Sequence, residues 1–153
     1  MRLAGIELGG TKAIAVLGDG DVVLDKRILP TRQPDETLGP LNTVLRDWHA
    51  EAALDGLGIA SFGPVDLNPA SPRYGTMLDT PKPHWSQVRV AKALTEGLSC
   101  PWLIDTDVNA AALAEYQRGS AIGCNSLCYI TLGTGVGGGL VIRGRAVHGA
   151  LHP

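Results

Sequence analysis

Two short segments of the sequence combine glycines with groups that can bind a phosphate. The first, Gly9-Gly10-Thr11-Lys12, places two residues without a Cβ before a hydroxyl and an ammonium group. Adjacent glycines let the backbone approach a ligand closely and can direct consecutive N–H groups toward one anion. Glu7, just before them, could hold phosphate-bound Mg²⁺ directly or through water. The alternative is a tight hairpin without a ligand, and the tetrapeptide alone does not decide between the two.

The second segment, residues 133–139, is Gly-Thr-Gly-Val-Gly-Gly-Gly. So much bare backbone between apolar runs costs conformational entropy unless a ligand uses it, which favours a phosphate loop over a merely flexible hairpin. Gly133, Gly135 and Gly138 also match the dinucleotide fingerprint G-x-G-x-x-G. That fingerprint must lead from a strand into a helix, whereas Leu140-Val141-Ile142 is strand-like. A dehydrogenase is therefore excluded.

A candidate general base follows a buried strand in the segment Asp105-Thr106-Asp107. Asp107 lies where a strand passes into a helix, so it could cap the helix N-terminus. Ligands also bind at the ends of strands in open α/β sheets, and an ionised carboxylate there can accept a proton from an attacking hydroxyl. Spacing leaves both roles for Asp107 open. For Asp105 we expect a structural role.

Hydrophobic patterning predicts the elements that position these residues. Leu38, Leu41, Leu45 and Trp48 give a helix beginning at Pro34 one apolar face. Residues 64–87 are proline-rich and predict a long irregular loop, which in a compact domain usually has a function. The expected elements are strands at 3–8, 13–17, 22–29, 57–60, 102–104, 127–132 and 140–142, and helices starting at 34 and spanning 88–98 and 107–118.

The resulting order β-β-β-α-β-α-β-α predicts an α/β fold with a mixed sheet covered by helices on both faces. We expect a domain at residues 1–119 and the first hairpin of a second such domain at 120–153.

Composition excludes several classes of protein. With 44% hydrophobic and 18% charged residues the chain can bury a core, and its net charge of −2 provides no basic surface for nucleic acid or membrane. The three cysteines, Cys100, Cys124 and Cys128, are too few and too scattered for a disulfide framework. We expect buried or unreactive thiols and a cytoplasmic protein.

Taken together, the motifs resemble the ROK kinases of the hexokinase and actin-like ATPase superfamily, which has a ribonuclease H-like fold. Gly5 to Lys12 resembles the first phosphate motif of the family, Asp107 to Ala112 its catalytic-base segment, and Ile130 to Gly139 its second phosphate motif. The resemblance covers the whole chain. Finer features resemble bacterial fructokinases: residues 61–66, 74–76, 80–82 and Trp85.

The resemblance implies transfer of the ATP γ-phosphoryl group to a hexose hydroxyl, with fructose as the expected sugar, Mg²⁺ as cofactor and a homodimer as the complete protein. Asp107 would be the base and a sugar contact, and Glu7 the residue for Mg²⁺. The nucleotide would be held on one side by Gly9, Gly10, Thr11 and Lys12, and on the other by Gly133, Thr134, Gly135 and Gly137. The sugar would be bordered by Gly63, Pro64 and Thr80.

Three features depart from the family pattern. Glu7 replaces the usual Asp, and Thr106 stands where glucokinase-type members have a sugar-binding Asn, which argues against glucose. The family's further sugar ligands, its zinc site and its adenosine pocket would follow Pro153, and the three cysteines do not match the zinc ligands. His148 and His152 are expected to be hairpin residues. The rival interpretations are a sugar-sensing regulator of the same family and a non-catalytic remnant.

Overall fold

The computed structural model describes residues 1–133 and 135–149. The first ten of its eleven elements in that part follow the expected order, the short strand β8 was not predicted, and the helix Asp107–Arg118 has the predicted bounds. In order they are β1 Arg2–Leu8, β2 Lys12–Asp19, β3 Val22–Pro30, α1 Pro34–Glu51, β4 Gly56–Ser61, α2 Val90–Thr95, β5 Trp102–Thr106, α3 Asp107–Arg118, β6 Ser126–Leu132, β7 Val136–Ile142 and β8 Arg145–Ala146.

The first five strands form one mixed sheet in the order β3-β2-β1-β4-β5. The meander β1 to β3 is antiparallel, whereas β4 runs parallel to β1 and β5 parallel to β4. Leu8 pairs with Ser61, and Ser61 pairs with Thr106. The last residues of three parallel strands therefore share one edge of the sheet, and the chain leaves each of them at the same level.

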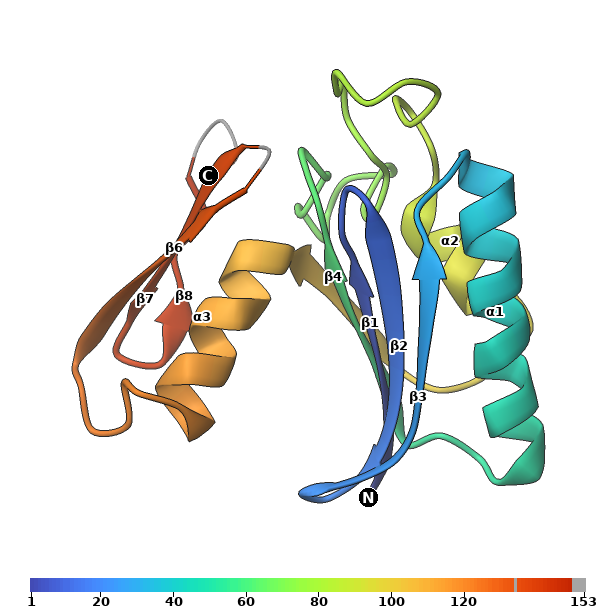
Figure 1. The fold of residues 1–153 in the computed structure, drawn as a ribbon, viewed down its shortest axis with the longest axis horizontal. Helices are drawn as coiled ribbons and strands as arrows, with labels where there is room; N and C mark the ends of the chain where they lie inside the picture. The colour runs from blue at the N-terminus through green and yellow to red at the C-terminus, as the bar shows by residue number, and fades with distance from the viewer. Residues whose placement is uncertain (134, 150–153) are drawn as a thin grey trace.

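Helices α1 and α2 cover one face of this sheet (Figure 1). The predicted apolar stripe of α1, from Leu38 to Trp48, is buried together with the inward-facing residues of β1 and β2, such as Ile6 and Ala15. Burial of this stripe supplies the main stabilisation of the layer, because each large aliphatic side chain removed from water contributes about 1.5–3 kcal/mol.

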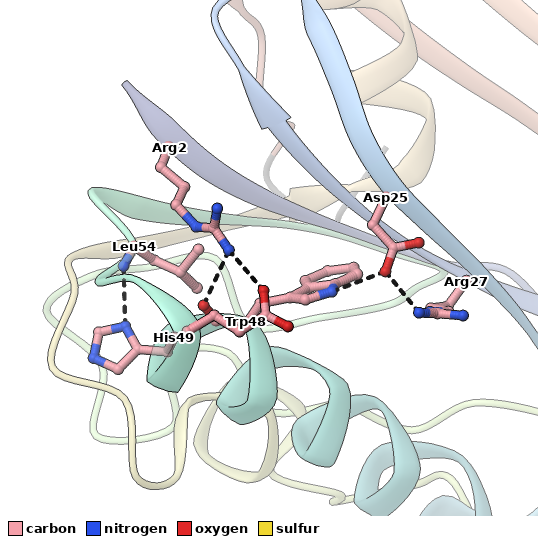
Figure 2. A network of polar contacts seen from close by, with 7 residues as sticks. Arg2, Asp25, Arg27, Trp48, His49 and Leu54 are labelled. Atoms are coloured by element: carbon pink, nitrogen blue, oxygen red, sulfur yellow. Dashed lines mark hydrogen bonds and ion pairs between the residues drawn. The ribbon is translucent and has the colours of Figure 1, made fainter.

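Trp48 also links α1 to the edge strand β3 through a polar network (Figure 2). Its indole N–H donates to Asp25 Oδ2 at 3.1 Å, and Arg27 forms an ion pair with the same oxygen at 2.8 Å. Arg2 on β1 donates to the Trp48 carbonyl at 3.3 Å. The indole and the backbone carbonyl of Trp48 thus both bind residues of the sheet, and together they hold the C-terminal half of α1 against it.

The second sheet, in the order β6-β7-β8, packs against α3, which also contacts β4 and β5. Helix α3 therefore lies between the two sheets (Figure 1). At its C-terminal end Arg118 forms an ion pair with Asp21 of the β2–β3 turn. The predicted cover on both faces is partial in the described residues: Leu103, on the face opposite α1 and α2, remains 74% exposed.

Two predicted elements have clearly different bounds in the structure. Helix α2 is shorter than 88–98, because Arg89 before it (φ −81°, ψ 72°) and Glu96 after it (φ −59°, ψ 124°) have non-helical backbone angles. Strand β7 begins at Val136 rather than Leu140, so the glycines at 137–139 belong to a strand and not to a turn.

Residues 62–89 form the expected irregular segment between β4 and α2. Trp85 anchors it: the side chain is fully buried, lies edge-on to Phe62 at 5.1 Å, and donates its N–H to the Arg32 carbonyl at 3.0 Å. The segment is therefore a packed loop with a defined position over the end of the sheet. No helix among the described residues is long and apolar enough to cross a membrane.

Candidate active site

The candidate residues meet at the edge of the sheet where β1, β4 and β5 end. Gly9 follows β1, the segment Phe62-Gly63 follows β4, and Asp107 follows β5. Because neighbouring strands are about 4.8 Å apart, the register places Gly9 and Asp107 about 10 Å apart across this edge, with Phe62 between them and Gly63 next in the chain. Ligands of open α/β sheets bind outside this end of the strands.

The first glycine turn, residues 9–12, is held by a hydrogen bond within the turn and by two from Thr31. Gly9 N–H donates to the Lys12 carbonyl at 3.0 Å, and a Cβ on Gly9 would lie 2.9 Å from that oxygen. Thr31 donates its hydroxyl to the Gly9 carbonyl at 2.8 Å and its N–H to the Thr11 carbonyl at 2.9 Å. The turn is therefore preorganised, while Gly10, Thr11 and Lys12 stay exposed to solvent.

Asp107 is the first residue of α3, and the cap of this helix is its neighbour. The Thr106 hydroxyl accepts a hydrogen bond from Asn109 N–H at 3.2 Å, with Thr106 in the extended conformation of an N-cap. Asp107 Oδ1 accepts a hydrogen bond from Val108 N–H at 2.9 Å. The interpretation of Asp107 as the N-cap was thus wrong. A carboxylate in the first turn of a helix is favoured in its ionised form by the helix dipole.

Asp105 has the structural role expected for it. Its Oδ1 accepts hydrogen bonds from Thr106 N–H at 2.7 Å and from the Asn109 amide at 2.8 Å. Its Oδ2 lies 3.0 Å from His148 Nε2, which connects the end of β5 to the segment after β8. Asp105 therefore fixes the conformation of the residues on both sides of Asp107.

The turn between β6 and β7 lies beyond the N-terminal end of α3. Strand β7 follows α3 lengthwise: a Cβ on Gly137 would lie 2.8 Å from Val108, near the helix start, and one on Gly144 would lie 3.5 Å from Tyr116, near its end. Gly133 and Gly135 therefore fall on the Asp107 side, and neither has an atom near its would-be Cβ. Thr134 lies outside the described residues.

The residues expected to border the sugar lie in or next to the long loop. The Gly63–Pro64 peptide is cis, and the Pro64 carbonyl accepts a hydrogen bond from Leu78 N–H at 2.8 Å. Thr80 accepts a weak hydrogen bond from Lys82 N–H at 3.4 Å and is bonded twice to Ser86. The register brings Gly63 and Pro64 next to Asp107, whereas Thr80 lies farther along the loop.

Lys82 is a functional candidate that the sequence analysis missed. Its ammonium group donates to the Gly10 carbonyl at 2.6 Å and lies 5.7 Å from the Phe62 ring centroid. A positive charge is thereby brought from residue 82 to the first glycine turn. No local pattern predicts this contact, because it depends on how the loop folds back over the sheet edge.

Glu7 lies on the sheet face opposite α1, exposed, one residue before the end of β1. Mg²⁺ in phosphate-transfer sites usually takes one or two carboxylates together with phosphate oxygens and water, so a single exposed Glu beside a phosphate turn fits this cofactor. Among the described residues no three His, Cys, Asp or Glu side chains gather closely enough to hold a metal ion by themselves.

A cavity beside this group of residues does not coincide with it. The cavity has a volume of about 780 Å³ and lies between the open sheet face and α3, lined mostly by aliphatic side chains such as Val16, Leu103 and Leu113. Glu7, Asp105 and His148 also line it, whereas Asp107 and the described residues of the glycine turns are not among its lining residues. A sugar and a nucleotide carry many polar groups, so the polar edge of the sheet suits their binding better than this apolar cavity does.

Comparison with known proteins gives consistent matches along the chain. The family model described as "ROK family" matches residues 3–152. The fructokinase of Zymomonas mobilis is 43% identical over 151 residues, which is 97% of this chain and 50% of that protein. The fructokinase of Pediococcus pentosaceus is 37% identical over 153 residues, covering 99% of this chain and 52% of that protein.

Among solved structures, a ROK family glucokinase from Streptomyces griseus, in complex with glucose and AMPPNP, superposes with a TM-score of 0.82 at 25% identity. The match covers 99% of this chain and 48% of that one. The chain therefore spans about half the length of the relatives it matches.

Proposed function

Because the chain belongs to the ROK family, we propose that it is the N-terminal, substrate-side half of an ATP-dependent sugar kinase. The observation that supports this most is the strand register, which brings the first glycine turn, Gly63-Pro64 and Asp107 to one edge of the sheet. Phosphate groups, a sugar and a base must meet in this order for phosphoryl transfer. The similarity to fructokinases over nearly the whole chain supports the same assignment.

In this proposal the two glycine segments bind the phosphates of ATP from opposite sides. Gly9, Gly10 and Thr11 offer N–H and hydroxyl donors, and Lys12 adds a positive charge. Gly133, Thr134, Gly135 and Gly137 were the expected contacts on the other side. Glu7 would hold Mg²⁺ beside the phosphates, where the ion would supply positive charge against the charge that develops on them.

Asp107 acts as the general base. Its carboxylate accepts the proton of a sugar hydroxyl while that oxygen attacks the γ-phosphorus, so an O–P bond forms and the bond to the leaving ADP breaks. The Thr106 cap and the contacts of Asp105 hold the carboxylate at the start of α3. Positioning of this kind provides most of the catalysis in phosphoryl transfer.

We propose fructose as the sugar, with Gly63, Pro64 and Thr80 bordering it and fructose 6-phosphate as the product. The fructokinase names of the two relatives support this choice. Residues 1–119 and 120–153 would belong to two lobes that close on the substrates and exclude water. The complete enzyme would be a cytoplasmic homodimer, with zinc held by residues outside this chain.

The experiment is a sugar panel coupled to ADP release. It uses the complete enzyme, meaning residues 1–153 joined to the half encoded after them or, where the gene ends there, to the C-terminal half of the Zymomonas mobilis fructokinase. We expect kcat/KM for fructose to exceed that for glucose and mannose at least tenfold. Preference for an N-acetylated sugar would refute the fructose assignment, and turnover of no sugar would refute the kinase itself.

A further inference from the structure

Two of the three consecutive glycines in β7 lie directly against helix α3. Side chains alternate along a strand, so Gly137, Gly139 and the fully buried Val141 face the helix, while Gly138 faces away from it. A Cβ on Gly137 would lie 2.8 Å from Val108 Cγ1 and 3.1 Å from Thr131 Cγ2. A Cβ on Gly139 would overlap the Val108 carbonyl group and lie 3.1 Å from Ala112 Cβ.

These contacts are closer than any residue with a Cβ allows. Both glycines have φ outside the left-handed region, so the backbone conformation does not require glycine there, and the steric contact does. Gly138, in the same strand, has only the Tyr129 carbonyl oxygen at 4.0 Å from its would-be Cβ. Within β7, glycine is thus required at the two positions that face α3 and not at the position between them, which faces away.

We infer that Gly137 and Gly139 are positioning residues that set helix α3, and with it Asp107, at a fixed distance from the second sheet. The nucleotide contacts of this segment are then confined to the turn at 133–135, and Gly137 leaves the set of predicted phosphate contacts. The role of Asp107 in this inference rests on the proposed function, whereas the packing of the two glycines against α3 does not.

A second, independent contact holds the same end of the helix. His148, two residues after β8, reaches Asp105 at 3.0 Å, and Asp105 in turn holds the Asn109 amide at 2.8 Å. The second sheet therefore fixes the Asp107 segment along one side of α3, through the two glycines, and at its start, through His148. A displacement of β7 by one methyl group would shift the base relative to the sheet edge that carries Gly9.

The packing is tested on the 153-residue chain with Gly137→Ala, Gly139→Ala and Gly138→Ala as the matched control. Overpacking a close contact destabilises the elements that form it. We expect amide exchange at Val108 and Asn109 to accelerate about tenfold in the first two variants and to stay within twofold of wild type in the third. Equal effects of all three substitutions, or no effect at 137 and 139, would overturn the inference.

A rescue experiment separates contact from backbone flexibility. Val108→Ala removes the Cγ1 that a Cβ at 137 would meet, so the double variant Gly137→Ala/Val108→Ala should regain most of the exchange protection relative to Val108→Ala alone. Gly139→Ala should not be rescued in this way, because its conflict is with the backbone carbonyl of Val108. Rescue of both glycine variants, or of neither, contradicts the assigned contacts.

The positioning role is tested in the complete enzyme by separating kcat from KM. Misplacing the base should lower kcat about tenfold or more in Gly137→Ala while KM for ATP stays within about twofold, and Val108→Ala should restore kcat. A raised KM for ATP with unchanged kcat would instead make Gly137 a nucleotide contact and overturn the inference. If the enzyme phosphorylates no sugar, the proposed function fails, and the exchange measurements still decide the packing.

Discussion

At the residue scale, the N-cap of helix α3 is Thr106, and Asp107 follows it. The Thr106 hydroxyl accepts the hydrogen bond from Asn109 N–H, and Asp107 Oδ1 accepts another from Val108 N–H. Thr106 is itself nearly fully buried, and its hydroxyl cannot be replaced by solvent. Two neighbouring residues at the end of β5 therefore have separate roles: Thr106 is the N-cap of α3, and Asp107 supplies the carboxylate of the candidate site.

We expect Thr106→Val, which preserves side-chain volume but removes the hydroxyl, to lower the free energy of unfolding by about 1 kcal/mol. Chemical denaturation of the 153-residue chain measures this change. Thr106→Ser keeps the acceptor and serves as the control, with a smaller loss expected. If the Ser and Val variants were equally destabilised, the cap would not be the reason for Thr at this position.

Lys82 is the second residue whose contact makes a specific prediction. Lys82→Met removes the cation from the Gly10 carbonyl while retaining the aliphatic stem, and we expect KM for ATP in the complete enzyme to rise about fivefold. Lys26→Met, an exposed lysine on β3, is the control and should leave KM unchanged. A KM unaffected by the Lys82 change would mean that its ammonium group stays on the carbonyl and away from the phosphates.

The two residues differ in how far the sequence predicts them. Asp107 follows a buried strand and opens a helix, and both features are visible in local patterning, so its location was predicted correctly. The contact of Lys82 joins residues 72 positions apart through an irregular loop, and no periodicity encodes that path. The choice of Thr106 over Asp107 as cap also depends on side-chain orientation, which spacing does not determine.

At the element scale, the link between α1 and β3 has a consequence for stability at acid pH. Partial desolvation acts to raise the pKa of Asp25, but hydrogen bonds from Trp48 and Lys26 N–H and the charge of Arg27 outweigh it and hold the pKa below its ordinary value. Because the pKa of Asp25 is lower in the folded state, the ionised side chain stabilises the fold at pH values above 3.8, its pKa in the unfolded chain. This contribution is lost as the pH falls through the folded-state pKa.

We therefore expect Asp25→Asn to lower the stability of the chain near pH 6 and to flatten the fall in stability between about pH 5 and pH 2. Trp48→Phe, which removes the indole donor, should flatten the same part of the curve by a smaller amount. Urea denaturation at a series of pH values gives both curves. Wild-type and Asp25→Asn curves that run parallel across this range would show that the contact with Trp48 contributes nothing.

The elements themselves were largely predictable, and strand β7 is the exception with a tertiary cause. The apolar stripe of α1 is a strong periodic signal, and α1 and β3 both begin at the predicted residue. Strand β7 was predicted four residues too short because glycines resemble a turn in sequence. In the structure, glycine at 137 and 139 lets α3 pack closely against β7. This is a tertiary contact between segments far apart in the chain.

At the scale of the whole molecule, α3 is the element that connects the two sheets. It contacts β4 and β5 on one side and all three strands of the second sheet on the other. Exposed apolar side chains remain on the first sheet's face toward α3, such as Leu103 on β5, and on the face of the second sheet that points away from α3, such as Ile130 and Val136. A parallel sheet is normally covered on both faces, so the described residues leave apolar surface that the fold type usually buries.

We expect the 153-residue chain by itself to bind ATP weakly and to phosphorylate fructose at no measurable rate. The reason is that the chain spans about half the length of its fructokinase relatives, and the lobe closure of the proposed function would need the other half. ADP release with purified chain and fructose measures this directly. A rate that is abolished by Asp107→Asn would show that residues 1–153 suffice for catalysis.

The measurement that tests the central claim most directly is the effect of Asp107→Asn on kcat in the complete enzyme, with Asp105→Asn as the neighbouring control. The substitution keeps the shape of the side chain and removes its basicity, so kcat for fructose should fall at least a hundredfold while KM for ATP stays within about twofold. Asp105→Asn should cost less and should also weaken the fold. If Asp107→Asn retained more than about a tenth of the wild-type kcat, the carboxylate at the start of α3 would not be the base, and the account of this site would be contradicted.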